Sequence, residues 1–161
     1  MKVKEIMTAN PKACNLTDNL AEAARLMWEE DCGIVPVVAE SGKVVGLITD
    51  RDICMAAMTK GRNESSIAIE DVISGKLFTC KPEDDIHSAL NTMRDNKVRR
   101  LPVVTADRKL AGMLSMNDVV LRAAEEGDKA TELSYGDVVN TYKSICQHRL
   151  PMQQAQAKTA I

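Results

Sequence analysis

The spacing of hydrophobic residues along the chain changes in the same order twice. Residues 20–28 and 86–93 carry apolar side chains three and four positions apart, which predicts two amphipathic helices. Asp18 and Asp84 stand where the N-caps of these helices belong. Two short aliphatic runs separated by a polar turn follow each helix, and the first run of each pair has a proline near its start, which marks the beginning or the edge of a strand. The runs are residues 34–38, 44–48, 101–104 and 110–114, and a further helix is predicted from about residue 50 and about residue 116.

The whole pattern is a duplication. Shifting the sequence by 66 residues aligns residues 3–58 with residues 69–124 without a gap, and eleven of the 56 paired positions are identical. A unit that recurs in register folds the same way twice, and its copies usually pack on one another. With the short extended segments at residues 12–14 and 78–80, each copy has the order β-α-β-β-α. This order predicts an α/β fold in which helices cover one face of a small sheet and the other copy covers the opposite face.

We predict the first repeat over residues 1–60, a polar, glycine-containing linker over residues 61–68, and the second repeat over residues 69–126. A unit of this size buries only a marginal core by itself, so we expect the two repeats to form one module. Function is then expected where the copies meet.

Residues 127–161 lie beyond the repeats. Ser134 is predicted to cap a last helix with an apolar stripe that needs burial against the module or against a partner. The stripe consists of Val138, Val139, Tyr142, Ile145 and Cys146. The polar, glutamine-rich end at residues 151–161 is predicted to be frayed.

Composition excludes several classes of function. The 161 residues are 45% hydrophobic and carry a net charge of −2, which does not attract nucleic acid. With one Trp, two Tyr and one Phe, few side chains could stack on bases. No apolar run approaches the roughly 18 residues that span a bilayer, and the N-terminus lacks the apolar region of a signal peptide. We therefore expect a cytoplasmic protein that binds neither membrane nor nucleic acid.

The five cysteines form no Cys-x-x-Cys pair and are expected to be reduced and mostly buried. Cys14 and Cys80 are equivalent in the two copies, so with Cys146 they are the candidates for a redox or metal sensor. The two histidines, His87 and His148, have no cysteine or carboxylate partner at a metal-ligand spacing, and no nucleophile stands next to a base. We predict no metal site and no catalytic residues.

Both copies contain the same strand-to-helix segment, Gly-x-x-Ser/Thr-x-x-Asp. Thr49 with Asp52, and Ser115 with Asp118, match a helix capping box, which is a structural role. The same turn also offers amides, a hydroxyl and the positive end of a helix dipole to a phosphate, and its carboxylate suits a ribose diol. A phosphate next to a carboxylate needs cations, which Arg51, Arg99 and Arg100 can supply.

The tandem arrangement resembles the cystathionine β-synthase (CBS) domain pair, or Bateman module, of short stand-alone bacterial and archaeal proteins. The resemblance covers residue 1 to about residue 125. It rests on Ile-Met-Thr at residues 6–8, Gly-Ile-Val-Pro-Val-Val at 33–38, Val-Arg-Arg-Leu-Pro-Val-Val at 98–104 and the two Gly-x-x-Ser/Thr-x-x-Asp segments. It implies two repeats packed through their sheets with pseudo-two-fold symmetry. It also implies two clefts for adenosine derivatives: AMP, ADP or ATP, and in some members S-adenosylmethionine or NAD.

The resemblance also implies roles for individual residues. Asp52 and Asp118 would bind ribose hydroxyls, and Thr49 and Ser115 would lie by the sugar and phosphate. Arg100 would bind phosphate, and Thr79 would form a hydrogen bond with the base. Ala13 replaces that threonine in the first copy, so the two clefts are not expected to bind alike. The expected ligand-binding residues are Thr49, Asp52, Ser115, Asp118, Arg100, Arg99, Thr79 and Arg51.

We therefore expect a non-catalytic regulatory module that senses an adenine nucleotide, forms a homodimer through its helices, and signals to a regulated protein that the sequence does not identify. Two alternatives stay open. One is an interaction protein with vestigial clefts, and the other is the cysteine-based redox or metal sensor.

Overall fold

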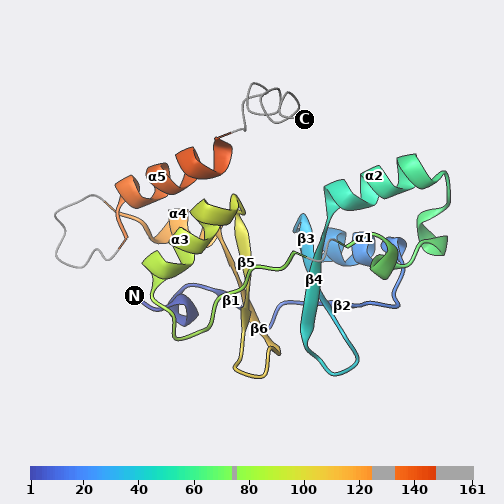
Figure 1. Cartoon of the computed structure of the whole chain (residues 1–161), viewed down its shortest axis with the longest axis horizontal. Helices are drawn as coiled ribbons and strands as arrows, with labels where there is room; N and C mark the ends of the chain where they lie inside the picture. The colour runs from blue at the N-terminus through green and yellow to red at the C-terminus, as the bar shows by residue number, and fades with distance from the viewer. Residues whose placement is uncertain (74–75, 125–132, 148–161) are drawn as a thin grey trace, which may run out of the picture.

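The structure is a computed structural model that describes residues 1–73, 76–124 and 133–147. It has two lobes, each with a three-stranded sheet, and Figure 1 shows the sheets in the middle of the molecule and the helices on the outer sides. The first lobe contains β2 (Cys14–Asn15), β3 (Ile34–Val38), β4 (Val44–Thr49), α1 (Leu20–Glu29) and α2 (Asp50–Lys60). The second contains β1 (Thr8–Ala9), β5 (Arg100–Val104), β6 (Leu110–Ser115), α3 (Ile86–Asn96), α4 (Met116–Arg122) and α5 (Tyr135–Cys146). Short 3-10 turns are η1 (Val3–Glu5), η2 (Glu64–Ser66) and η3 (Ile69–Asp71). The predicted α/β fold, with its pseudo-two-fold pair of repeats and its C-terminal helix, is confirmed.

The leading segments of the two repeats are exchanged between the lobes. β1, from the start of the chain, pairs with β6, and Val3 and Ile6 are buried in the core of the second lobe. Ile67, at the end of the linker, and Ile69, at the start of the second repeat, are buried in the core of the first lobe. Each lobe therefore completes its core with a segment of the other repeat, as expected for units too small to fold separately.

Gly46 and Gly112 are identical in the two copies because the exchanged segments cross the sheets at these positions. A Cβ atom on Gly46 would lie 2.8 Å from Cδ1 of Ile73, and one on Gly112 would lie 2.9 Å from the carbonyl oxygen of Thr8. A Cβ at position 112 would therefore require the backbone of the exchanged segment to shift, whereas one at position 46 would require a shift of the Ile73 side chain.

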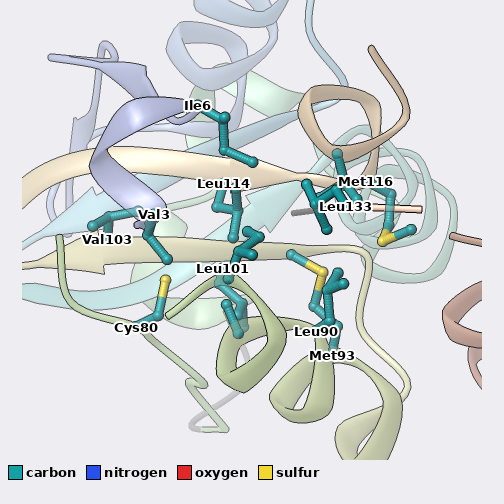
Figure 2. Close-up of a cluster of buried hydrophobic side chains, with 13 residues drawn as sticks. Val3, Ile6, Cys80, Leu90, Met93, Leu101, Val103, Leu114, Met116 and Leu133 are labelled. Carbon is teal, nitrogen blue, oxygen red and sulfur yellow. The ribbon is translucent and has the colours of Figure 1, made fainter. Parts of the chain in front are cut away.

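The core of the second lobe is shown in Figure 2. It joins Leu90 and Met93 of α3 to Leu101 of β5, Leu114 of β6 and Met116 at the start of α4. Burial of such side chains stabilises the lobe by about 1.5–3 kcal/mol each. Leu133, ahead of α5, is also fully buried in this cluster, so the C-terminal helix is part of the second lobe.

Helix α5 confirms most of the stripe predicted for it. Ser134 caps it, because the Ser134 hydroxyl accepts from the amide of Asp137 and the carboxylate of Asp137 accepts from the amide of Ser134. Val138, Tyr142 and Ile145 pack against the core of the second lobe. The stripe is therefore buried mainly within the same chain, and two of its members, Val139 and Cys146, are exposed on the single chain. The predicted frayed end, residues 151–161, lies outside the described residues.

Two expectations for the first helices need correction. Trp28, predicted on the buried stripe, is 89% exposed, although the adjacent Met27 is only 6% exposed. The N-caps are Asn19 and Asp85, one residue later than predicted. The side chains of Asp18 and Asp84 instead accept hydrogen bonds from amides three residues earlier, and so close the turns that lead into the helices. Among the described residues no helix is both long and apolar enough to cross a membrane.

Candidate functional site

A cleft of about 360 Å³ lies between the two lobes and takes its walls from both repeats. We call it the Asp118 cleft. It is lined by Thr8, Pro11 and Lys12, by residues 30–36, by Arg100, and by Met113, Ser115, Asn117 and Asp118. Its volume lies within the usual range for small-molecule sites. The exchange of leading segments forms one wall, because it pairs Thr8 of β1 with Met113 of β6, and the chain continues from there to Pro11 and Lys12.

Asp118 has both a structural role and spare binding capacity. Its Oδ2 accepts from the amide and the hydroxyl of Ser115, both at 2.7 Å, and its own amide donates to the Ser115 hydroxyl at 3.3 Å. The predicted capping box is therefore present. Among the described residues no donor reaches the second carboxylate oxygen, Oδ1, so the cap leaves one acceptor on a side chain that lines the cleft.

The register of the second sheet places a cation next to this cap. Arg100 on β5 pairs directly with Ser115 on β6, which puts their side chains on the same face of the sheet. Arg100 is half-buried, and within the described part of the chain its guanidinium forms no ion pair or hydrogen bond. At the equivalent position of the first copy, Ile34 pairs with Thr49. Only one of the two caps therefore has an arginine opposite it.

The cleft also contains charged residues that sequence reasoning missed. Lys12 adds a second cation, whereas Glu30 and Asp31 add two carboxylates beside Asp118. Their equivalents in the second copy are Phe78, Asn96 and Lys97, none of them acidic. This difference between the copies was the only sequence signal for these three residues. It could not be assigned to a shared cleft, because a comparison of the repeats does not show that the two lobes face one another.

The remaining predicted residues lie elsewhere. Thr49 and Asp52 form the same capping box in the first copy, with contacts of 2.7–3.1 Å, but neither lines the Asp118 cleft. Arg51 and Arg99 are exposed and Thr79 is half-buried, also outside that cleft. The residues equivalent to the Thr8–Ala9 wall are 74 and 75, which lie outside the described residues. Binding at this second position stays a prediction.

Backbone amides are less available than the sequence suggested. In the second copy the amide of Met116 donates to the carbonyl of Arg99 at 3.0 Å, and the amides of Ser115 and Asp118 are used by the cap. In the first copy the side chain of Asp50 also accepts from the amide of Arg51, at 2.7 Å. A phosphate would therefore be held mainly by side-chain cations.

The positions of Cys14 and Cys80 do not support the hypothesis of a redox or metal sensor. Cys14 and Cys80 are buried in separate cores, one in each lobe, so they do not share a cleft. Burial raises the pKa of the Cys14 thiol to about 11 and that of Cys80 to about 12, which makes both poor nucleophiles and poor metal ligands. In the part of the chain that the structure covers, no three His, Cys, Asp or Glu side chains gather as a metal site would require.

Comparison with known proteins supports the interpretation of the fold. The CBS domain family model matches the chain twice, at residues 3–59 and 69–125. The uncharacterized protein YlbB of Bacillus subtilis is 31% identical over 140 residues, which cover 84% of this chain and 93% of YlbB.

Two solved structures share the fold. The CBS domain protein TA0289 from Thermoplasma acidophilum superimposes with a TM-score of 0.73 at 21% identity, covering 94% of this chain and 82% of TA0289. The CBS domain pair of protein MJ0100, solved in complex with 5'-methylthioadenosine and S-adenosyl-L-methionine, has a TM-score of 0.68 at 24% identity, covering 75% of this chain and 94% of its own. With a duplicated sequence, paired lobes and a match to both repeats, the chain belongs to the CBS domain family as a tandem CBS pair.

Proposed function

We propose that this chain is a non-catalytic regulatory module that binds an adenosine-containing ligand of the AMP, ADP or ATP class in the Asp118 cleft and signals its occupancy to a regulated protein. One observation carries the proposal. Arg100, a cation without a partner among the described residues, lies opposite Ser115 in a cleft that also contains the free carboxylate oxygen of Asp118. A cation beside an unused acceptor is the chemistry that a ribose phosphate needs.

Each group has a distinct role in this proposal. The free Oδ1 of Asp118 accepts from a ribose hydroxyl, while Oδ2 keeps the helix capped. Arg100 binds a phosphate oxygen with its planar guanidinium, and Lys12 adds a second positive charge to the lining of the cleft. The complex of MJ0100 with two adenosine derivatives supports this class of ligand.

Charge sets the expected order among nucleotides. The lining of the cleft contains three carboxylates, Glu30, Asp31 and Asp118, and two cations, Lys12 and Arg100. Each additional phosphate brings negative charge that these two cations do not fully offset. We therefore propose that AMP binds more tightly than ADP, and ADP more tightly than ATP. S-adenosylmethionine and NAD are the competing ligands, and the sulfonium of the former would be favoured by the carboxylates rather than by Arg100.

For the equivalent position in the first copy we propose a second, weaker site. Thr49 and Asp52 would contact the sugar, and Thr79 would bond the base. Arg51 and Arg99 would approach the phosphate.

We propose further that the module is a homodimer. Met55 on α2 and Leu121 on α4 occupy equivalent positions in the two copies, and both are exposed, by 53% and 83%. Met58, one turn after Met55 on α2, is 78% exposed. A pseudo-symmetric pair of apolar side chains suits a two-fold interface between helices. Light scattering that gives a mass near 17.6 kDa at micromolar concentration would contradict it.

Calorimetric titration of the full chain with adenosine, AMP, ATP and S-adenosylmethionine tests the function. We expect AMP to bind best, and Asp118→Ala to lose most of that affinity while Asp107→Ala, an equal change in the exposed β5–β6 turn, keeps it. If no adenosine derivative binds or raises the free energy of unfolding by ligand linkage, the clefts are vestigial and pairing itself is the function. Tighter binding of S-adenosylmethionine than of every nucleotide would overturn the phosphate assignment.

A further inference from the structure

The two lobes carry equivalent grooves between their paired helices, but only one of them is filled. In the second lobe α5 packs on both α3 and α4, as Figure 1 shows. Its apolar residues Val138, Tyr142 and Ile145 lie against the cluster that includes Leu90, Met93, Met116 and Val119. This groove therefore serves as a seat for an amphipathic helix.

The equivalent groove of the first lobe, between α1 and α2, is an open cavity of about 530 Å³. Its lining residues Ala24, Met27, Asp50 and Ile53 are the equivalents of Leu90, Met93, Met116 and Val119, which belong to the cluster that α5 packs against in the second lobe. Trp28, the only tryptophan of the chain, lies at its rim and is 89% exposed. The same groove is thus present twice, and in the first lobe no described segment of the chain occupies it.

The charge at one end of the groove is reversed between the lobes. In the second lobe Lys97 donates from Nζ to the carbonyl of Gln147 at 2.6 Å, and so binds the C-terminal end of α5. Its equivalent in the first lobe is Asp31, which has the same left-handed backbone conformation, with φ of 47° against 55° for Lys97. Asp50 adds a second carboxylate where the second lobe has Met116. This end repels helix carbonyls and attracts positive charge.

We propose that the α1–α2 groove is the docking site for an amphipathic helix of a partner protein, whose apolar stripe lies on Met27, Trp28 and Ile53 and whose basic N-terminal end meets Asp31 and Asp50. A helix N-terminus carries positive partial charge, and lysine or arginine in its first turn adds to it. The proposed helix thus points its N-terminal end at this part of the groove, whereas α5 presents its C-terminal carbonyls to Lys97 in the second lobe.

A second copy of this chain fits the groove poorly through its own α5. In the direction that α5 adopts in the second lobe, its C-terminal carbonyls would face Asp31. In the opposite direction its first turn would bring Asp137 to Asp31 and Asp50. Like charges meet in both directions. The groove is also distinct from the Met55 and Leu121 surface proposed for the homodimer, since neither residue lines it.

Two helical peptides test the proposal, with Trp28 as the reporter. Both are stapled and carry valine, tyrosine and isoleucine at the spacing of Val138, Tyr142 and Ile145. One has two lysines in its first turn and its twin has two glutamates. The experiment uses the full chain without nucleotide, so its outcome does not depend on the proposed ligand. We expect the lysine peptide to shift Trp28 emission to shorter wavelength and the glutamate twin to bind about tenfold more weakly.

Asp31→Lys is the decisive variant, because Lys97 shows that this backbone conformation accepts lysine. We expect it to reverse the preference, so that the glutamate peptide binds better. Asp107→Lys, the same change in the exposed β5–β6 turn, should leave the preference intact. Equal binding of the twins, no change in Trp28 emission with either, or an unreversed preference in Asp31→Lys overturns the proposal. So does a Trp28 emission that shifts with protein concentration alone as dimers form in sedimentation, because a second copy then covers the groove.

Discussion

Replacing Arg100 with alanine should separate recognition of phosphate from recognition of the nucleoside. The substitution removes the cation that pairs across the sheet with Ser115 and leaves the capping box between Ser115 and Asp118 intact. In the described part of the chain the guanidinium has no partner, so its removal leaves no protein group newly unpaired. The loss should therefore appear in ligand binding and not in the free energy of unfolding.

The expected size of the loss follows from the charge on the hydrogen bond. A hydrogen bond between an arginine and a phosphate in a partly buried site contributes about 1.5–3 kcal/mol. That range corresponds to an increase in the Kd for AMP of about 10- to 150-fold. Adenosine lacks the phosphate, so its weaker binding should change little.

Calorimetric titration of AMP and adenosine into wild type, Arg100→Ala and Arg99→Ala measures both effects. For the tighter site, the Asp118 cleft, Arg99 is the matched control, since it is the adjacent arginine, lies outside the lining of that cleft and is proposed to act only at the weaker second site. Equal losses for adenosine and AMP in Arg100→Ala would show that Arg100 supports the shape of the cleft and does not bind phosphate. A loss in Arg99→Ala as large as that in Arg100→Ala would show that a general positive field, rather than the β5–β6 register, determines affinity.

Three further predictions concern the stability and chemistry of the fold. Thr141→Val should raise the free energy of unfolding in denaturant titration by about 1 kcal/mol, because the buried Thr141 hydroxyl of α5 has no hydrogen-bond partner among the described residues. A loss of stability would show that the hydroxyl has a partner in solution. A thiol reagent should rapidly label the three exposed cysteines, Cys32, Cys54 and Cys146, in the folded protein. It should reach Cys14 and Cys80 only after unfolding, because burial raises their pKa values to about 11 and about 12. Equally fast labelling of all five thiols would contradict the burial. The pKa of Asp137 is lowered, first by the hydrogen bond from the Ser134 amide. The stability that the ionised carboxylate adds to the cap of α5 is therefore fully present above the unfolded pKa of about 4, and it is lost as the pH falls through the lower pKa of the folded state. Denaturant titration should show this loss in wild type and not in Asp137→Asn.

Local features of the site could be predicted from the sequence because they depend on neighbours in the chain. The capping boxes of Ser115 with Asp118, and of Ser134 with Asp137, need only residues three positions apart, and the structure contains both. The repeat itself predicted the two lobes, because a strand and helix pattern in register folds alike twice.

Features that depend on contacts between the copies could not be predicted in this way. Two equivalent leading segments fit either sheet by pattern, so the repeat does not show that β1 pairs with β6 rather than with β4. For the same reason Lys12 could not be assigned to the cleft that Arg100 lines. The predicted burial of Trp28 was wrong, because helical spacing predicts only that a helix has an apolar stripe. Whether another segment covers that stripe depends on the rest of the chain. In the second lobe α5 supplies that cover.

The cleft and the open groove share a wall, which gives the duplication a physical use. Asp31, Cys32 and Gly33 line both the Asp118 cleft and the α1–α2 groove. A phosphate in the cleft and a basic helix end in the groove would therefore both interact with the charge of Asp31. Because coupling between two binding equilibria is reciprocal, any change that a nucleotide makes in the affinity of the helix must be matched by the same factor in the affinity of the nucleotide. In the second lobe Lys97 stands in place of Asp31 and already holds α5, so this coupling would operate through the first lobe. Divergence at one pair of equivalent residues thus gives one copy a fixed helix and the other an open groove next to the cleft.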